Sequence, residues 1–138
     1  MKAEEVFKAG LGALVVYPKW HKNGKDRVFR IRGYELGEEY VSLTDGVIQT
    51  KTHISFIKPI PLTPDEFVKL GFELEKDKTW WRKGFISINP KNGFVHFDYD
   101  RRDAFEFFTV NSSNCKHVHQ LQNLYHSLKG EELQYKND

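Results

Sequence analysis

One cysteine and three histidines lie close together near the C-terminus, in the segment NCKHVHQLQNLYHSLKG: Cys115, His117, His119 and His126. Thiolate and imidazole are preferred zinc ligands, and a cysteine beside a histidine can also form a nucleophile-base pair. On a helix, however, His119 and His126 would lie about 10 Å apart along the axis, whereas a helical metal pair needs a spacing of three or four residues. We therefore expect a packing helix here, without a metal site.

The apolar residues of this segment predict which helix face is buried. At 100° per residue they form one continuous stripe, and His119 and His126 fall on its polar flank. The stripe consists of Val118, Leu121, Leu124, Tyr125 and Leu128.

A second candidate is the strand-like stretch that contains His96, Asp98 and Asp100. Alternation along a strand places these three side chains on one face, where they could bind a divalent cation or perform acid-base chemistry. The competing interpretation is the solvent face of a half-buried antiparallel strand, which shows the same alternation.

A third candidate is the stretch from Lys19 to Arg32, in which six basic residues stand against a single acidic one, Asp26. Basic side chains beside an aromatic ring are the combination used to bind single-stranded nucleic acid. A solvated hairpin, with lysines that protect a sheet edge, is the alternative. The expected contact residues are Trp20, Lys22, Lys25, Arg27, Arg30 and Arg32.

The elements of the first half are short and extended. Residues 3–9 are compatible with a helical turn, and the Asn23-Gly24 and Asp45-Gly46 pairs favour tight turns between period-two strands. Five short strands in about 50 residues suit a closed barrel, because closure removes exposed edges. We predict an SH3-like β-barrel subdomain over residues 1–60.

The second half begins with a strong helix signal. Thr63 is a capping residue, Pro64 stands at the first helical position, Glu66 is three residues after the cap, and Gly71 ends the helix. Strand patterns follow up to the C-terminal helix, so residues 61–138 are predicted to form an α-β-β-β-β-α subdomain. The expected fold is α+β: the barrel packed on a second antiparallel sheet flanked by two helices.

Adjacent tryptophans occur at Trp80 and Trp81. Neighbours on a strand face opposite ways, so one ring is expected in the core and the other needs a separate cover, for which the barrel is our expectation.

Composition narrows the function classes. The 138 residues carry a net charge of +2, which is too weak a global field to indicate nucleic acid or membrane binding, so only local clustering matters. The single cysteine excludes a disulfide framework, and neither a signal peptide nor a membrane span is evident. We expect a soluble cytoplasmic protein. No phosphate loop, G-x-S-x-G or H-E-x-x-H motif occurs, and no cofactor is indicated.

Two stretches carry a resemblance: IKPIPLTPDEFVKLGFE (57–73) and KHVHQLQNLYHSLKGEEL (116–133). They resemble a family of short uncharacterised proteins from Bacteroidetes, often associated with prophages or mobile elements. In those proteins a small β-rich part precedes a PIPLT-type helix ending in GF, and a VHQLQNLY-type helix closes the chain. Ser127-Leu128-Lys129 departs from the family's more frequent Ala-Leu-Thr. The resemblance implies relatives and a mobile-element setting, and no activity.

The sequence thus favours a non-enzymatic binding module, with single-stranded nucleic acid as the leading ligand. The alternative is a protein-protein component of a phage or mobile-element assembly. A hydrolase-like or metal-dependent activity at His96, Asp98 and Asp100 is the third hypothesis. The oligomeric state is left open.

Overall fold

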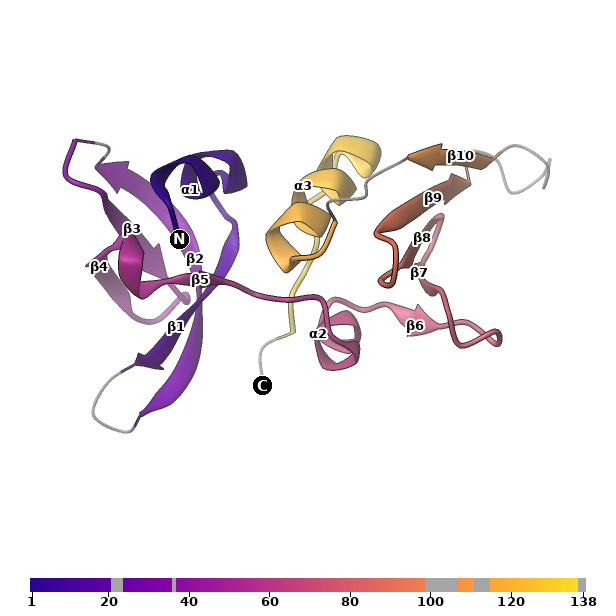
Figure 1. Cartoon of the computed structure of the whole chain (residues 1–138), viewed down its shortest axis with the longest axis horizontal. Coiled ribbons are helices and arrows are strands. Elements are labelled where there is room, and N and C mark those ends of the chain that lie inside the picture. Colours follow the sequence, from indigo (N-terminus) through magenta and orange to yellow (C-terminus); the bar gives the residue numbers. More distant parts are fainter. Residues whose placement is uncertain (21–23, 36, 99–106, 111–114, 137–138) are drawn as a thin grey trace. The chain divides into compact units, whose positions relative to one another are not determined.

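The computed structural model describes residues 1–20, 24–35, 37–98, 107–110 and 115–136; of residues 97, 98 and 107–110 it describes the backbone alone. The chain divides into two compact units, Met1–Ile60 and Pro61–Asp138, and each contains one five-stranded antiparallel sheet. Few helices accompany the sheets (Figure 1), so the expected α+β class is confirmed.

Unit 1 consists of one helix, five strands and a 3-10 turn, η1. In chain order these are α1 (Ala3–Ala9), β1 (Leu14–Trp20), β2 (Lys25–Glu35), β3 (Tyr40–Thr44), β4 (Gln49–His53), η1 (Ile54–Phe56) and β5 (Lys58–Pro59).

The sheet of unit 1 has the strand order β4-β3-β2-β1-β5. β2 is the longest strand: its first part pairs with β1 and its second part with β3, with a register shift between Ile31 and Gly33. The last strand returns to the first, where Val15 faces Pro59. β4 and β5 remain the two edges in the described part of unit 1, so the expectation of a closed barrel is not met by these pairings. β5 has two residues, and in the described residues its register pairs are with β1.

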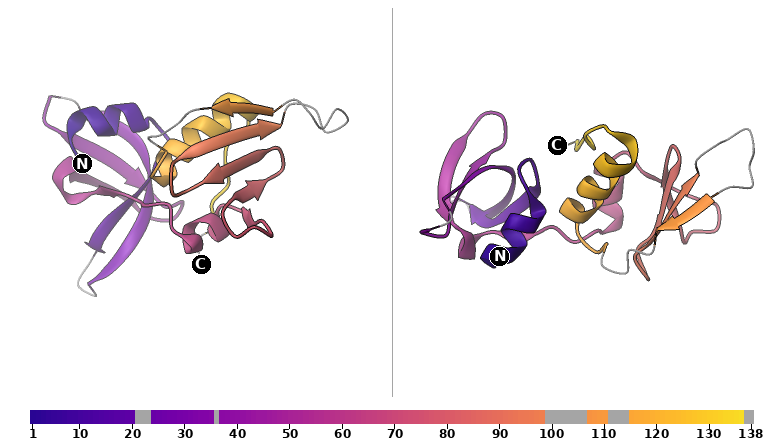
Figure 2. Two further views of the ribbon diagram at one scale, coloured as in Figure 1. Left: turned by 45° about the vertical axis from the view of Figure 1, so that its right-hand side comes forward. Right: turned by 90° about the horizontal axis from the view of Figure 1, so that it is seen from above.

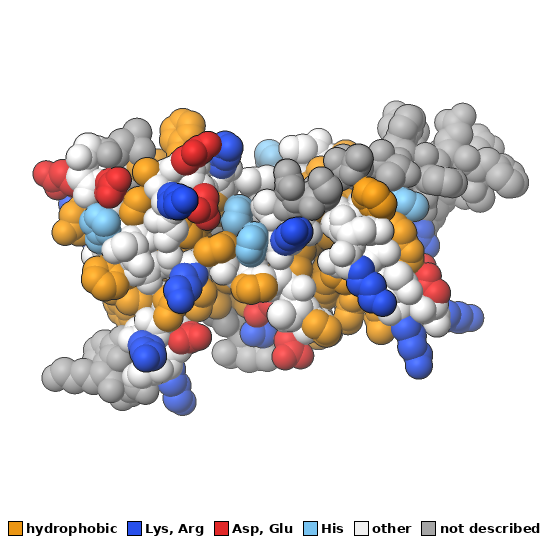
Figure 3. Space-filling model, viewed as in Figure 1, with side chains coloured by type: hydrophobic (Ala, Val, Ile, Leu, Met, Phe, Trp, Pro, Cys, Tyr) orange, Lys and Arg blue, Asp and Glu red, His pale blue; other side chains and the backbone are white. Residues whose placement is uncertain are grey.

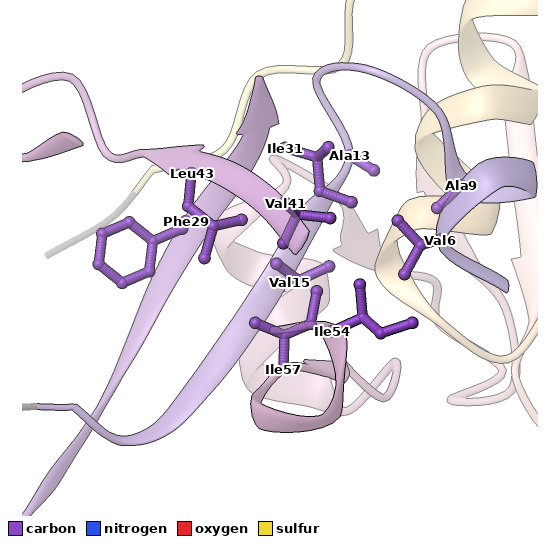
Figure 4. Packing of buried hydrophobic residues seen from close by; sticks show 10 residues of the cluster. All are labelled: Val6, Ala9, Ala13, Val15, Phe29, Ile31, Val41, Leu43, Ile54 and Ile57. Carbon is purple, nitrogen blue, oxygen red and sulfur yellow. The ribbon is translucent and has the colours of Figure 1, made fainter. Parts of the chain in front are cut away.

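The core of unit 1 is built from the inward side of this curved sheet. Alternation buries Phe29 and Ile31 on β2, and Val41 and Leu43 on β3 (Figure 4). The short helix α1 adds its two buried side chains to the same cluster. The cluster consists of Val6, Ala9, Ala13, Val15, Phe29, Ile31, Val41, Leu43, Ile54 and Ile57.

Unit 2 contains a five-stranded sheet of order β10-β9-β8-β7-β6 and two helices. This is one strand more than the four in the predicted α-β-β-β-β-α order. The elements are α2 (Pro64–Lys69), β6 (Glu73–Leu74), β7 (Trp81–Lys83), β8 (Ile86–Asn89), β9 (Phe94–Asp98), β10 (Phe107–Val110) and α3 (Val118–Lys129).

The predicted helix start at Thr63 is confirmed. Its hydroxyl accepts a hydrogen bond from the Glu66 amide (3.4 Å), and Pro64 occupies the first turn. The helix buries Phe67 completely, and the Phe67 ring stacks on Trp81 with centroids 5.0 Å apart and planes 7° apart. This stack joins α2 to the sheet inside unit 2.

No helix in the described part of the chain is long and apolar enough to span a membrane.

Candidate functional site

The register of the β1–β2 hairpin sorts the predicted contact residues by face. Trp20 pairs with Lys25, and Tyr17 pairs with Arg27, so these four side chains share a face. Two residues further along β2, on the same face, lies the buried ring of Phe29. The hairpin extends beyond the body of unit 1 in Figure 1 and in the left panel of Figure 2. Three predicted residues, Trp20, Lys25 and Arg27, are therefore brought together.

Two other predicted residues are not part of this group. Arg30 has the opposite parity to Phe29 on β2, and its guanidinium donates to the Gly12 carbonyl oxygen (3.2 Å). Arg32 is exposed and falls at the register shift of β2, where simple alternation does not hold. The sequence analysis treated the six residues as one surface because it grouped them by charge along the chain and not by strand face.

The tip of the hairpin is only partly described. Lys25 is exposed, and the Lys19 amide donates to the carboxylate of Asp26 (3.0 Å), which ties the two strands together near the turn. Lys22 lies outside the described residues, and its contact role stays a prediction.

Arg27 takes part in a structural ion pair. Its Nε donates to Asp45 Oδ2 (2.9 Å), and a second guanidinium nitrogen contacts the same oxygen. The other carboxylate oxygen accepts from the amides of Ile48 (2.7 Å) and Val47 (2.9 Å) in the β3–β4 turn. Those backbone donors, with Arg27 in addition, lower the pKa of Asp45 to about 2. Arg27 is 38% exposed at its side chain, so one edge of the guanidinium still faces solvent.

An aromatic strip, defined as Phe56, Tyr17 and Trp20, lies beside these basic residues. The Tyr17 and Phe56 rings are stacked, with centroids 6.3 Å apart and planes 3° apart. Trp20 meets Tyr17 edge-on at 5.0 Å and Phe29 edge-on at 5.1 Å. Phe56 is 58% exposed, which is unusual for a phenylalanine in a packed unit. The strip therefore offers an accessible aromatic face next to Lys25 and Arg27.

The sequence analysis missed Tyr17 and Phe56. The alternation of Val15 and Tyr17 on β1 could have predicted that Tyr17 lies on this face. No local sequence pattern indicates that Phe56 joins it. Its position depends on η1 and on the pairing of β5 with β1, which join distant parts of the chain.

The η1 turn is held by a histidine. The amide of Ser55 donates to His53 Nδ1 (3.2 Å), and Ser55 Oγ lies 2.8 Å from the same nitrogen. Because a backbone N–H can only donate, Nδ1 is unprotonated in this arrangement and Nε2 carries the proton. Nε2 lies 3.5 Å from a carboxylate oxygen of Glu39.

Serine, histidine and glutamate in this order resemble a nucleophile, its base and an orienting acid. The same imidazole nitrogen, however, also accepts the amide of Ser55, which is only two residues away. The geometry is that of a turn cap.

The His96 candidate in unit 2 is described in part. The His96 ring lies against Trp80, with centroids 4.3 Å apart, on the sheet face that also bears Ser87. That the barrel covers Trp80 stays a prediction. The side chain of Asp98, and Asp100 altogether, lie outside the described residues, so a shared metal or acid-base face stays a prediction.

The histidines of α3 are placed differently from the prediction. His119 is buried at 9% exposure, as is Gln122 at 7%, whereas Leu124 and Leu128 are only partly buried. The buried face therefore includes His119, and the rings of His117 and His119 stack at 5.7 Å with planes 6° apart. The predicted polar flank is therefore wrong for His119 and correct for exposed His126.

Cys115, the single cysteine of the sequence, is buried at 1% exposure. Among the described residues, no three His, Cys, Asp or Glu side chains come together as metal ligands.

Unit 2 also has an open groove of about 730 Å³ beside its β6–β7 edge. Lys83 lies at one side, donating to the Leu70 carbonyl oxygen (3.0 Å) and lying 5.6 Å from the Tyr125 ring centre. Burial lowers the pKa of the Lys83 ammonium. This lysine joins the end of α2 to β7 and α3. The groove is lined by Gly71, Glu73, Leu74, Glu75, Lys76, Asp77, Arg82, Lys83 and Gly84.

Charge on the visible surface is dispersed. Figure 3 shows Lys and Arg side chains interspersed with acidic and apolar ones, without one continuous basic field. A ligand that depends on positive charge would therefore have to be recognised locally.

Comparison of the chain with protein-family models, with curated proteins and with solved structures found no match.

Proposed function

We propose that unit 1 binds single-stranded nucleic acid on the face of the β1–β2 hairpin. The observation that carries this proposal is the shared face of Trp20, Lys25 and Arg27 with Tyr17, beside the exposed ring of Phe56. Of the six residues predicted from the sequence, we now assign the contact to Trp20, Lys25 and Arg27, and the role of Lys22 rests on the sequence alone. Arg30 and Arg32 are left out of the assigned surface.

Two kinds of interaction support the proposal: base stacking on the aromatic rings and phosphate contacts to the basic side chains. Bases stack on aromatic side chains whatever their sequence, each stack contributing about 1–3 kcal/mol, while basic groups neutralise the backbone phosphates. Phe56 has an exposed ring at one end of the strip, and the exposed cation Lys25 is paired with Trp20 at the other end. Arg27 is paired with Asp45, which offsets its positive charge. Its contribution is therefore a guanidinium group held in a fixed orientation toward the ligand.

The test is fluorescence anisotropy with a labelled single-stranded 20-mer of mixed sequence, over a series of salt concentrations. We expect Phe56→Ala to weaken binding about 5- to 30-fold, which corresponds to one lost stack. Lys25→Ala should reduce the salt slope by about one phosphate contact. Arg32→Ala is the matched control, because it removes the same charge from the same strand outside the assigned face.

Absence of binding at low salt and high micromolar protein would reject nucleic acid as the ligand. Equal losses from Arg32→Ala and Lys25→Ala would reject the assigned face while leaving general electrostatic binding in place.

We also propose that unit 1 is a member of the SH3-like barrel class. Support comes from the five-strand order and from the return of β5 to β1 after a 3-10 turn, which brings the first and last strands together. Chemical-shift assignment and amide nuclear Overhauser contacts between β4 and β5 would establish closure, and their absence would leave an open sheet.

A protein-protein role is the second candidate, favoured by large apolar side chains on the surface of unit 1. Phe7 is 64% exposed, Leu11 67% and Val47 88%. In this proposal the chain is a component of a phage or mobile-element assembly in the cytoplasm, in line with the family resemblance. Light scattering across a concentration series tests self-association; a concentration-independent monomer leaves only a different protein as partner.

The third hypothesis, an activity at His96, Asp98 and Asp100, is tested by elemental analysis of the purified protein. A stoichiometric divalent metal that is lost in Asp98→Asn would support it, and metal-free protein without hydrolase activity would reject it.

A further inference from the structure

We propose that η1 is a pH-sensitive support of the aromatic strip, and that protonation of His53 releases the Ser55 amide and loosens Phe56. This inference deepens the proposed function, on which its binding consequence rests, by assigning a regulation to the same site. The structural part does not depend on the ligand.

The first step is the requirement for an unprotonated nitrogen. His53 Nδ1 accepts the Ser55 amide (3.2 Å) at the start of a turn of only three residues. A proton on Nδ1 would place two donors face to face. The Ser55 hydroxyl, 2.8 Å away, can rotate to accept from a protonated ring, but the amide cannot. Protonation therefore removes the cap of the turn.

The second step is the opposing effect of Glu39. Its carboxylate is 3.5 Å from Nε2 and its side chain is 55% exposed. The neutral tautomer already donates Nε2–H toward this oxygen, and attraction between exposed charges at this distance is strongly screened. Glu39 thus favours the protonated ring weakly and offers no replacement for the lost amide acceptor.

Other titratable groups surround the turn. Tyr40 contacts the His53 ring edge-on at 5.5 Å, and the Lys51 ammonium lies over Tyr40. The Met1 ammonium donates to the carbonyl oxygens of Ile54 (2.8 Å) and Ile57 (2.6 Å), and burial lowers its pKa. The charges that act on the Met1 ammonium are those of Glu5 and Lys58.

These groups act on different sides of η1. The ammonium binds carbonyl groups, which holds the body of the turn, whereas His53 binds the amide of Ser55, the residue before Phe56. Because the Met1 ammonium can also change its charge with pH, the test uses a variant that lacks the imidazole of His53 and keeps this ammonium.

The third step links the turn to the strip. Phe56 is the last residue of η1, and its ring is held by parallel stacking on Tyr17 while 58% exposed. A ring with so little burial depends on its backbone for position. Loosening the turn therefore lowers the population in which Phe56 and Tyr17 offer one continuous stacking face.

The experiment compares wild type with His53→Asn between pH 7.5 and 5.5. Asparagine retains a side-chain acceptor for the turn amide and does not titrate. In wild type we expect the chemical shift of the Ser55 amide to change as the pH is lowered. We also expect the hydrogen-exchange rate of this amide, divided by the rate in His53→Asn, to rise about 5-fold over the same range. This is the ratio expected for the loss of one cap. His126→Asn is the matched control, because His126 is exposed on α3 and its replacement removes another imidazole away from the turn.

Oligonucleotide affinity is measured on the same three proteins. The ratio of wild-type affinity to His53→Asn affinity should fall about 3- to 5-fold from pH 7.5 to 5.5, and His126→Asn should behave as wild type. An unchanged Ser55 resonance in wild type, or an equal titration in His53→Asn, would overturn the switch. If no protein binds the oligonucleotide while Ser55 still titrates in wild type alone, the proposed function fails and the pH-sensitive turn stands.

Discussion

The hydrogen bonds that Asp45 accepts from the Ile48 and Val47 amides and from Arg27 permit a quantitative prediction of acid sensitivity in unit 1. The pKa of Asp45 is lowered from 3.8 to about 2, and a shift of this size corresponds to roughly 2 kcal/mol of stability at neutral pH. Because Arg27 is 38% exposed, solvent screening reduces the expected contribution to about 1 kcal/mol.

The perturbation is Asp45→Asn, which keeps an oxygen for the amides of Val47 and Ile48 and removes the charge that binds Arg27. The sign follows from the direction of the pKa shift. A lowered folded pKa contributes stability above the unfolded value of 3.8, and this contribution is lost as pH falls through about 2. The variant should therefore be about 1 kcal/mol less stable at pH 7, and the two proteins should converge near pH 2.

The assay is urea unfolding followed by the NMR amide peaks of Val41 and Leu43, because both are buried in unit 1 and report that unit alone. Glu38→Gln serves as control, since it removes an equal charge from an exposed position in the same unit. A pH-independent difference between wild type and Asp45→Asn would refute the reasoning, because the loss would then reflect packing and not charge.

Two further predictions concern unit 2. Thr63→Ala removes the hydroxyl that caps α2 and should cost about 1 kcal/mol in urea unfolding, whereas Thr63→Ser should retain most of that stability; equal losses would mean that the cap does not contribute. Gly71→Ala should destabilise the unit by more than 1 kcal/mol, since the residue has a φ of +82° and an added Cβ would lie 3.0 Å from Lys83 Nζ. In the double variant Gly71→Ala with Lys83→Met, the contact between the new Cβ and Lys83 Nζ is removed but the positive φ remains. Fully restored stability in this double variant would contradict the explanation that backbone strain causes the loss.

Features governed by neighbours in the chain could be predicted from the sequence. The α2 start at Thr63-Pro64 and the turn at Asp45-Gly46 follow from local backbone chemistry, and both are found. The period-two pattern expected for the first half is also local, and on β2 it corresponds to the burial of Phe29 and Ile31.

Features that join distant segments could not be predicted in this way. Arg27 meets Asp45 only after two hairpins have formed, and no spacing rule links residues 18 apart. Phe56 reaches Tyr17 only because β5 pairs with β1. The burial of His119 was missed because a hydrophobicity pattern treats imidazole as polar, although a flat ring packs well against another ring.

The return of β5 to β1 has a consequence for the rate at which unit 1 opens. Hairpins between successive strands form early, whereas the contact of Val15 with Pro59 closes nearly the whole unit and is the costliest loop to form. Separation of these two end strands is thus a natural first step of unfolding. Tyr17 lies on β1, and Phe56 comes just before β5. A single-stranded nucleic acid whose bases stack on both rings would therefore link these two strands. Such a ligand would slow the unfolding of unit 1 more than it accelerates folding.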